Sequence, residues 1–491
     1  MPMNFKRILF TFFFFILLYP AQSQISIISD SILTVKRVDS LLTIPKKPFN
    51  AAGLIFTTNM GVWSFDRFIT RGEYAHINFS TIKQNIKTGF VWDNDMFVTN
   101  LFAHPYHGGM YFNAARSNGM NFWQSIPFNA GGSLMWEFCM ENEPAAINDF
   151  MATSIGGASL GEITFRISDL FIDDRSIGFE RFKREALLTL VSPIRGLNRL
   201  LNGDAWKHRN IRGNTISGPP VIFYTSIGHR IIQDNSQKKE DTSNMLCFDL
   251  GVYYGNPFDK ENEKPYDFFF LKLSGNFFAQ QPIISRVNAL GILYSKDIKL
   301  RNPTRQLNFG IFQHFNFYQS NADINNVSLN PYKISEAASA GPGLLYKTIK
   351  KNKFSFSSSL YLSAIALGGS QTDHFRSEKR DYNMGSGFST KLSFELNFRD
   401  KARLFLNSED YRLYSWIGYN PAVTETVDSN VQGDVGIASL SVARLNFNYT
   451  IKKHFLIAIE TSINYRKSIY KYYPTVEHST KENKISVGYI F

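Results

Sequence analysis

The chain has 491 residues and a formal net charge of +12 at pH 7, and 15% of its residues are aromatic, including 45 Phe and 23 Tyr. Two cysteines in regions of different character indicate neither a disulfide framework nor a structural zinc site. The basic residues form no compact run of the kind that follows a phosphate backbone. The absence of such a run argues against nucleic acid as the partner. The net positive charge then favours anionic lipid headgroups or a small charged solute.

The N-terminus has the pattern of a secretory signal peptide. Lys6 and Arg7 precede an apolar run over residues 8–18, and the small residues Ala21 and Ser23 stand at the positions that a signal peptidase reads. The run is too short to cross a bilayer as a helix, which takes about 20 residues. We therefore predict export and cleavage after Ser23. No other apolar stretch reaches the ~18 residues of a membrane helix, so a helical membrane protein is excluded.

Residues 85–205 have the spacing of helices. Apolar and small residues recur every three to four positions over 128–142, and Asn148 or Asp149 can cap a following helix. Another broad apolar face runs over 179–201. We expect about four helices in this region. The expected division of the chain is a signal peptide at 1–23, a periplasmic leader or linker at 24–84, a helical domain at 85–205 and a transmembrane barrel at 206–491.

Three stretches of the helical region carry a family resemblance. They are HPYHGGMYFNAARSNGMNFW at 104–123, GGSLMWEFCMENEPAAINDFMATSIGGASLGEITFRISDLFIDDR at 131–175 and SPIRGLNRLLNGD at 192–204. They resemble the bacterial domain-of-unknown-function family 3943, a group of exported proteins of Gram-negative bacteria. The resemblance covers roughly residues 85–205 and implies an exported domain. It implies no reaction, because the family has no established activity.

After the helical region, apolar and polar residues alternate with the period of a β-strand. In residues 390–398, for example, Leu392 and Phe394 alternate with Lys391 and Glu395. Twelve segments share this rhythm, near 215–232, 244–257, 266–279, 284–300, 305–319, 333–350, 352–370, 383–400, 402–420, 436–451, 454–471 and 481–491. An even number of such strands is typical of bacterial outer-membrane barrels. The predicted fold is a membrane all-β barrel of about twelve antiparallel strands, with an N-terminal α-helical segment that plugs the lumen or caps its periplasmic mouth.

The lengths of the connections support the same fold. Tight turns at 350–352, 400–401 and 452–453 alternate with long polar loops around 320–332, 371–382, 421–435 and 472–482. Outer-membrane barrels have short periplasmic turns and long outer loops. If Phe491 ends in the periplasm, every tight turn falls on the periplasmic side. The last strand then closes the cylinder against the first. Its terminal aromatic residue resembles the signature that the barrel assembly machinery recognises.

Polar residues of the helical region are candidates for chemistry. His104, Glu137 and Asp149 have the residue types of an acid–base site, with His104 as the base and a carboxylate orienting it. We expect no metal and no other cofactor, because HExxH does not occur and Pro105 interrupts the helix face shared by His104 and His107. The alternative is a buried polar network that docks the helices to the barrel. The remaining members expected in that network are Tyr106, His107, Arg116, Glu141, Asn148, Glu162 and Arg166.

The sequence favours a non-enzymatic protein of a Gram-negative outer membrane, with a pore, transport or structural role. The residues expected in the lumen, where they would favour small charged solutes, are Lys272, Lys391, Glu395, Arg444, Glu460 and Arg466. The alternative is a lipid-modifying enzyme with a His and carboxylate site between helices and barrel, and a third hypothesis is a surface scaffold or adhesin. The expected partners are outer-membrane lipids, including lipopolysaccharide, and the barrel assembly machinery.

Overall fold

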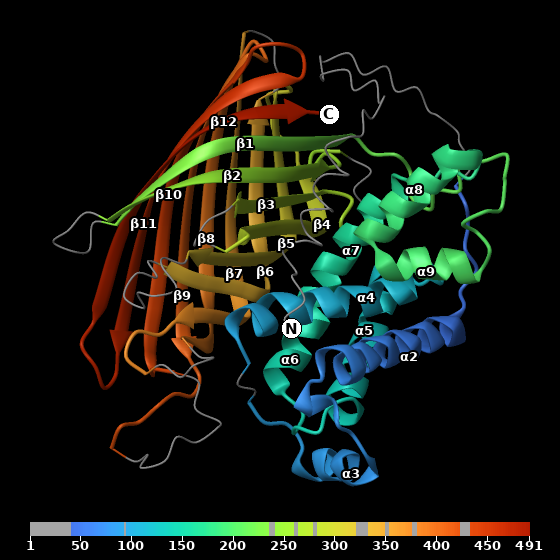
Figure 1. The fold of residues 1–491 in the computed structure, drawn as a ribbon. Helices are drawn as coiled ribbons and strands as arrows, with labels where there is room; N and C mark the ends of the chain where they lie inside the picture. Colours follow the sequence, from blue (N-terminus) through green and yellow to red (C-terminus); the bar gives the residue numbers. More distant parts are fainter. Residues whose placement is uncertain are drawn as a thin grey trace.

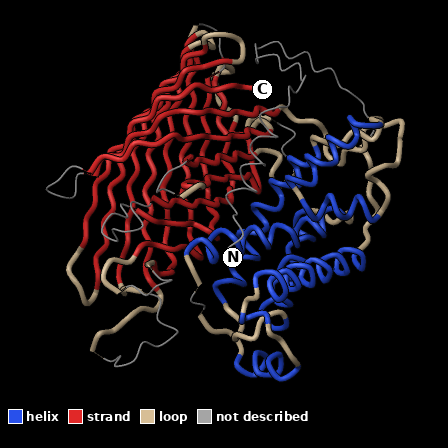
Figure 2. Tube along the Cα trace, viewed as in Figure 1, coloured by secondary structure: helices blue, strands red, loops and turns tan. Residues whose placement is uncertain are grey.

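The computed structural model describes residues 41–92, 95–234, 241–259, 264–277, 282–320, 332–348, 353–375, 381–422 and 433–491. The signal peptide, its cleavage site and the turn expected at 350–352 lie outside these residues. Within them, a helical unit precedes a barrel of β-strands, and Figures 1 and 2 show the two lying side by side. None of the described helices combines the length and the hydropathy needed to cross a membrane.

The helical unit begins earlier than the sequence pattern indicates. Its α-helices are α2 (Pro48–Phe65), α3 (Phe79–Thr88), α4 (His104–Ser117), α5 (Phe122–Cys139), α6 (Ile147–Met151), α7 (Gly157–Asp169), α8 (Gly178–Val191) and α9 (Pro193–Leu201). Short π-helices are η1 (Asp66–Thr70), η3 (Thr99–Ala103) and η4 (Ala152–Gly156), and η2 (Glu73–Ala75) is a 3₁₀ turn. Leu54 and Ile55 of α2 pack on Tyr111 and Ala114 of α4. The packed unit therefore includes part of the expected leader.

Local chemistry explains the starts and breaks of these helices. The side chain of Asn78 caps α3, and that of Asn121 caps α5, each in a reciprocal capping box. The single helix expected over 179–201 is divided at Ser192 into α8 and α9. Pro193 has no backbone N–H and disfavours a helical conformation at the residue before it. The number of helices is therefore larger than the four expected.

The barrel confirms the prediction of twelve antiparallel strands. They are β1 (Val221–Asp234), β2 (Asp241–Tyr254), β3 (Phe269–Phe277), β4 (Ile284–Ile298), β5 (Arg305–Ser320), β6 (Tyr332–Thr348), β7 (Phe354–Gln371), β8 (Tyr382–Phe398), β9 (Ala402–Ser415), β10 (Gly436–Thr450), β11 (Phe455–Tyr470) and β12 (Val476–Ile490). Each strand pairs with its sequence neighbours, and β12 pairs with β1 to close the cylinder. The loop expected at 472–482 is mostly strand, because Glu482 belongs to the alternating inward row of β12.

Hydrogen bonds that cross the barrel identify the side chains in its lumen. The hydroxyl of Tyr318 in β5 donates to Glu409 in β9 at 2.6 Å, and that of Tyr332 in β6 donates to Glu482 in β12 at 2.5 Å. These strands are not neighbours in the sheet, so the contacts can form only through the interior. Polar side chains therefore bridge the lumen at this level.

Residues that alternate with the lumen row point outward. On β8–β12 and β1 this outer row is apolar and exposed, and it includes Ile227, Phe388, Phe394, Leu404, Leu445, Phe447, Ile457, Ile459, Ile485 and Val487. An exposed apolar band around a closed barrel is the surface expected to face lipid. The predicted arrangement of an apolar outside and a polar inside is thus present in the structure.

The helical unit packs against the outside of the barrel wall. Phe97 and Phe102 contact Phe317, with ring centroids 5.1 and 5.7 Å apart. Phe317 precedes the lumen residue Tyr318, so its ring points outward. The same apolar core joins Phe112, Phe122, Ala158, Leu160 and Ile163 of the helices to the outward residues Val252, Tyr254, Phe269, Val287, Ala289, Phe315, Ala337 and Met384. The helices thus cover part of the outer face of β2–β8.

This arrangement corrects the prediction of a plug or a periplasmic cap. A helical segment does precede the barrel, but its described contacts with the barrel are made by outward side chains. The physical reason is that a wall bearing Phe315, Phe317 and Tyr254 offers an apolar surface to the helices, whereas the lumen is lined by charged and polar groups. Figure 1 shows α4, α6 and α7 beside the barrel wall.

Polar contacts fix the position of the helical unit on the wall. Gln313 of β5 donates to the carbonyl of Ile155 at 2.9 Å, and the hydroxyl of Tyr266 lies 2.9 Å from both Gln313 Oε1 and Ser159 Oγ. Close backbone packing adds to this, since a Cβ on Gly156 would lie 2.8 Å from the carbonyl oxygen of Ala337. The approach needs a residue without a side chain at this point.

Candidate functional site

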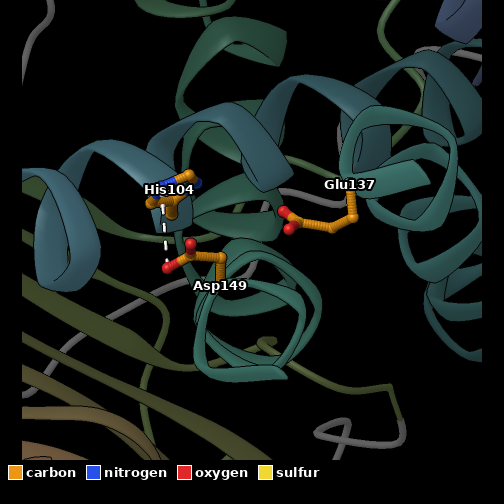
Figure 3. Close-up of side chains that lie close together, drawn as sticks. All are labelled: His104, Glu137 and Asp149. Carbon is orange, nitrogen blue, oxygen red and sulfur yellow. Dashed lines mark ion pairs between the residues drawn. The ribbon is translucent and has the colours of Figure 1, made fainter. Parts of the chain in front are cut away.

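Three of the sequence-predicted candidates meet in one place. His104 comes from α4, Glu137 from α5 and Asp149 from α6, and Figure 3 shows their side chains turned toward a common centre. One ligand-type atom from each lies within 4.8 Å of the others. His104 Nε2 is 3.6 Å from Asp149 Oδ1. Glu137 and Asp149 are only 2% and 4% exposed. The fold therefore brings a partly buried imidazole to two buried carboxylates.

Irregular helices position two of these side chains. The π-helix η3 ends at Ala103, and α4 begins with His104. Asp149 lies in α6, and the π-helix η4 follows α6 at once. Single π turns inside helices occur often at functional sites. Pro105 falls in the first turn of α4, where its missing N–H is tolerated, so the expected interruption of the helix does not occur.

Backbone and amide donors orient the two carboxylates. The N–H of Ala146 donates to Glu137 Oε2 at 2.8 Å, and the side-chain amide of Asn148 donates to Asp149 Oδ1 at 2.7 Å. Asn148, which the sequence analysis assigned to the docking network, thus contacts the candidate site. These donors fix the orientation of both carboxyl groups.

His107 lies one helical turn after His104 and has a different environment. Its ring packs on Tyr111 and Trp136, with centroids 4.6 and 5.0 Å away. Its Nε2 is buried and has no hydrogen-bond partner among the described residues. Burial, together with the nearby His104, lowers the pKa of His107 to about 3, so its imidazole is neutral.

The other predicted polar residues fall into two groups. Glu162 accepts from Arg116 Nε at 2.6 Å and from Arg166 Nε at 2.8 Å, which forms the docking network expected from the sequence. Arg166 extends that network to the barrel, because it donates to the carbonyl of Pro265 at 2.7 Å. Glu141 accepts from the indole of Trp136 instead of joining the His104 cluster. Tyr106 is 40% exposed on the surface of α4.

Sequence reasoning missed a second buried network in the helical unit. Asp174 is fully buried and pairs with Arg199 at 2.7 Å and Arg181 at 3.0 Å. Arg195 pairs with Asp169 and donates to the carbonyl of Phe165 at 2.8 Å. The SPIRGLNRLLNGD stretch contains both Arg195 and Arg199, so the family resemblance held a signal for them. The spacing alone did not reveal their acidic partners, which lie 25 and 26 residues away.

Four of the predicted lumen residues contact one another or other inward side chains. Lys391 donates to Glu336 at 2.7 Å, Lys272 lies 4.0 Å from Glu460 on the far strand β11, and Arg444 is 3.6 Å from Glu460. The remaining two also have polar partners: Glu395 accepts from Ser357 at 3.3 Å, and Arg466 pairs with Asp373 at 2.7 Å. Opposite charges thus neutralise each other along the inside of the barrel.

Comparisons with known proteins agree with the sequence resemblance for the helical unit. The model of the family described as Domain of unknown function (DUF3943) matches residues 89–194. No protein of curated function matches the chain. The family match covers the part of the chain that supplies His104, Glu137 and Asp149.

Solved structures with some similarity are outer-membrane barrels. The NanC porin has 11% identity and a TM-score of 0.26, and covers 54% of this chain and 98% of its own. OmpT, an outer membrane protein of Vibrio cholerae, has 8% identity and a TM-score of 0.22, and covers 56% and 98%. The translocator domain of autotransporter NalP from Neisseria meningitidis has 11% identity and a TM-score of 0.23, and covers 60% and 95%. At these scores the similarities carry no functional argument, and the barrel assignment rests on the strand pairing of this chain.

Proposed function

We propose that the protein is an outer-membrane barrel whose helical unit carries a site for modifying a membrane lipid. The closed barrel, its exposed apolar outer row and its polar interior support a place in an outer membrane. The export signal predicted at residues 1–23 supports a Gram-negative host. Because the helical unit lies on the outside of the wall, its site is beside the lipid and not inside the cylinder.

The observation that carries this proposal is the convergence of His104, Glu137 and Asp149. A neutral His104 imidazole can take a proton from water or from a lipid hydroxyl, and a carboxylate beside it stabilises the imidazolium that forms. Asp149 Oδ1 lies 3.6 Å from His104 Nε2. Glu137 adds a second negative charge on the other side of the centre. Hydrolysis or transfer of an ester-linked group is the reaction class that such a set of residues serves.

The place of the site on the barrel supports a lipid substrate. Leu101, three residues before His104, packs close to Gly369 near the end of β7. Asn100 donates to the hydroxyl of Tyr382 at the start of β8. These strand ends lead into the loop between β7 and β8, on the side opposite to the tight turn at 399–401. With Phe491 at the periplasmic end, the site is near the outer leaflet, where lipopolysaccharide is the main lipid.

The pore hypothesis receives less support from the geometry. Tyr318, Glu409, Tyr332 and Glu482 meet across the interior, so side chains occupy the path that a solute would take. A solute pathway would require these contacts to open. The third hypothesis, a scaffold that binds through outer loops, has no observation that favours it over the enzyme.

The test compares the lipids of strains that carry different histidine variants. Lipid A and phospholipid profiles are measured by mass spectrometry in a deletion strain complemented with wild type, His104→Ala or His208→Ala. His208 is exposed and lies outside the site, so it is the matched control. We expect a lipid species that is present with wild type and His208→Ala and absent with His104→Ala. Identical profiles in all three strains, at equal protein levels, would count against a lipid-modifying enzyme.

A further inference from the structure

We propose that His104, Glu137 and Asp149 bind a divalent first-row transition-metal ion of the Zn²⁺ or Mn²⁺ type. The inference rests on the proposed function and deepens it, because it assigns a cofactor to the same site; with an ion bound, His104 would be a ligand, and a water on the ion would replace His104 as the base. It replaces the sequence-based expectation that the protein has no metal. One imidazole nitrogen and two carboxylate oxygens form a ligand set that such ions accept.

The spacing of the donor atoms fits a shared ion. Nitrogen and oxygen ligands lie about 2.0–2.2 Å from Zn²⁺, so two ligands at a tetrahedral angle are roughly 3.4 Å apart. His104 Nε2 and Asp149 Oδ1 are 3.6 Å apart, a separation too long for a hydrogen bond and close to that of two ligands on one ion. The third donor, from Glu137, completes a set within 4.8 Å.

The surroundings of these donors resemble those of metal ligands in general. Ligating carboxylates are usually held by outer hydrogen bonds that leave one oxygen for the metal. Ala146 N–H donates to Glu137 Oε2 at 2.8 Å, which leaves Oε1 for an ion. Asn148 donates to Asp149 Oδ1 at 2.7 Å and so orients that carboxylate. The three ligands come from α4, α5 and α6, so binding would join three helices.

A buried nitrogen beside the cluster provides a second, independent observation. His107 Nε2 is buried and makes no hydrogen bond within the described residues. It is one turn of α4 from His104, and its ring rests on Trp136, the neighbour of Glu137. Buried polar atoms in folded proteins usually bond to the protein, to water or to an ion. His107 follows His104 by three residues on α4, so its nitrogen is a further candidate donor at this site.

Electrostatics also favour a cation at this position. Glu137 and Asp149 are 2% and 4% exposed, and their oxygens lie within 4.8 Å of each other. Two carboxylates at this distance in a low-dielectric interior repel each other, and a dication between them converts the repulsion into attraction. When bound, such an ion would supply a polarised water or a Lewis acid to the proposed reaction.

The test measures metal binding directly and needs no lipid substrate. Full-length protein in detergent is treated with a chelator, dialysed, and titrated with ZnCl₂, MnCl₂ and MgCl₂ by calorimetry, with bound metal counted by plasma mass spectrometry. We expect about one equivalent of Zn²⁺ or Mn²⁺ per chain. His104→Ala and the nearly isosteric double variant Glu137→Gln/Asp149→Asn should each weaken binding at least ~10-fold. His208→Ala, with its exposed side chain, should bind as wild type does.

The outcomes separate this inference from the proposed function. The isosteric variants keep the side-chain volumes, and the heat-dependent mobility of the barrel on gels checks that each variant is folded. Wild type without stoichiometric metal, or folded site variants that bind as tightly as wild type, would overturn the metal site. Metal binding without any change in the lipid profile of the His104→Ala strain would keep the metal site and reject the lipid enzyme. A lipid change in the His104→Ala strain, in a protein that binds no metal, would keep the lipid enzyme and reject the metal site.

Discussion

Removing the charge of Glu162 tests whether the buried ion network holds the helical unit to the barrel. Glu162 is fully buried and accepts from Arg116 at 2.6 and 3.0 Å and from Arg166 at 2.8 Å. Arg166 also pairs with Asp267, in the connection between β2 and β3, at 3.0 Å. Glu162→Gln keeps the shape of the side chain but leaves two buried guanidinium groups without their shared counter-ion.

The size of the effect follows from the cost of an uncompensated buried charge. Breaking a buried pair by removing one partner costs about 3–5 kcal/mol, and Gln keeps one acceptor, so we take about 3 kcal/mol. Since 1.4 kcal/mol is a factor of ten, the open form of the helical unit should become about 100-fold more populated. When opening and closing are fast relative to cleavage, the rate of proteolysis follows that population.

The assay is limited trypsin digestion of the detergent-solubilised protein, with the barrel followed by its heat-dependent mobility on gels. We expect cleavage within the helical unit to be about 100-fold faster in Glu162→Gln while the barrel stays folded. The matched control is Glu180→Gln, whose carboxylate is 41% exposed and pairs with Lys183 and Arg184 on the surface of α8. An exposed pair contributes about 0–1 kcal/mol, so this change should alter the rate less than ~5-fold. Equal rates for the two variants would refute the assigned role of Glu162.

Three further outcomes follow from the described contacts. Gly157→Ala should destabilise the helical unit by about 1–3 kcal/mol, because the new Cβ would lie 2.6 Å from the backbone of Gly108. In the same digestion assay the control Gly131→Ala, whose new Cβ would meet nothing within 4 Å, should be neutral or stabilising. His107 has a pKa of about 3 when folded and about 6.5 when unfolded, so its contribution is complete above pH 6.5 and is lost as the pH falls toward 3. Denaturant unfolding at pH 7 and pH 5 should show a smaller pH dependence for His107→Gln than for wild type, and equal dependence would contradict the buried neutral imidazole. In planar bilayers the wild type should conduct poorly and Tyr332→Ala should conduct more, because that hydroxyl bridges the lumen to β12; a large wild-type conductance would contradict the bridged interior.

The strands could be predicted from the sequence because the environment of the barrel imposes a period of two. Each outward position must be apolar and each inward position polar, and Leu392, Phe394 and Lys391 show this rule without any tertiary information. Strand ends were less certain. The polar residues near Glu482 have the composition of a loop. In the structure they belong to a strand, and Glu482 pairs with Arg230 inside the barrel at 2.7 Å. Polarity alone does not distinguish a lumen-facing strand from an exposed loop.

The position of the helices could not be predicted, because the sequence does not say what covers an outward apolar residue. Phe315 and Phe317 have the same pattern as lipid-facing residues such as Ile457 and Ile459, yet they are buried under the helical unit. A strand needs apolar outward residues whether lipid or an apolar helix face covers it. A plug or cap was therefore as consistent with the sequence as a cover on the wall, and the packing of residues such as Phe97 on the wall distinguishes them.

The candidate site was predicted in its members but not in its geometry. His104, Glu137 and Asp149 were selected by residue type, and their meeting depends on close helix packing, where Gly132 of α5 meets Tyr111 of α4 and Gly108 of α4 meets Thr153 just after α6. The role of Pro105 was misjudged, because its position in the first turn of α4 depends on where the preceding π-helix ends. Such irregular turns leave no clear periodic signal.

The helices cover the barrel on one side only, and this affects the order in which helix packing and barrel closure can occur. The outer face of the seam between β1 and β12 is bare, as the exposed Ile227, Ile485 and Val487 show. The helical unit can therefore pack on β2–β8 while the strands still form an open sheet. Pairing of β1 with β12 then displaces none of the helices. In such an intermediate, the aromatic side chains of the wall would be buried by the helices before the barrel enters the lipid.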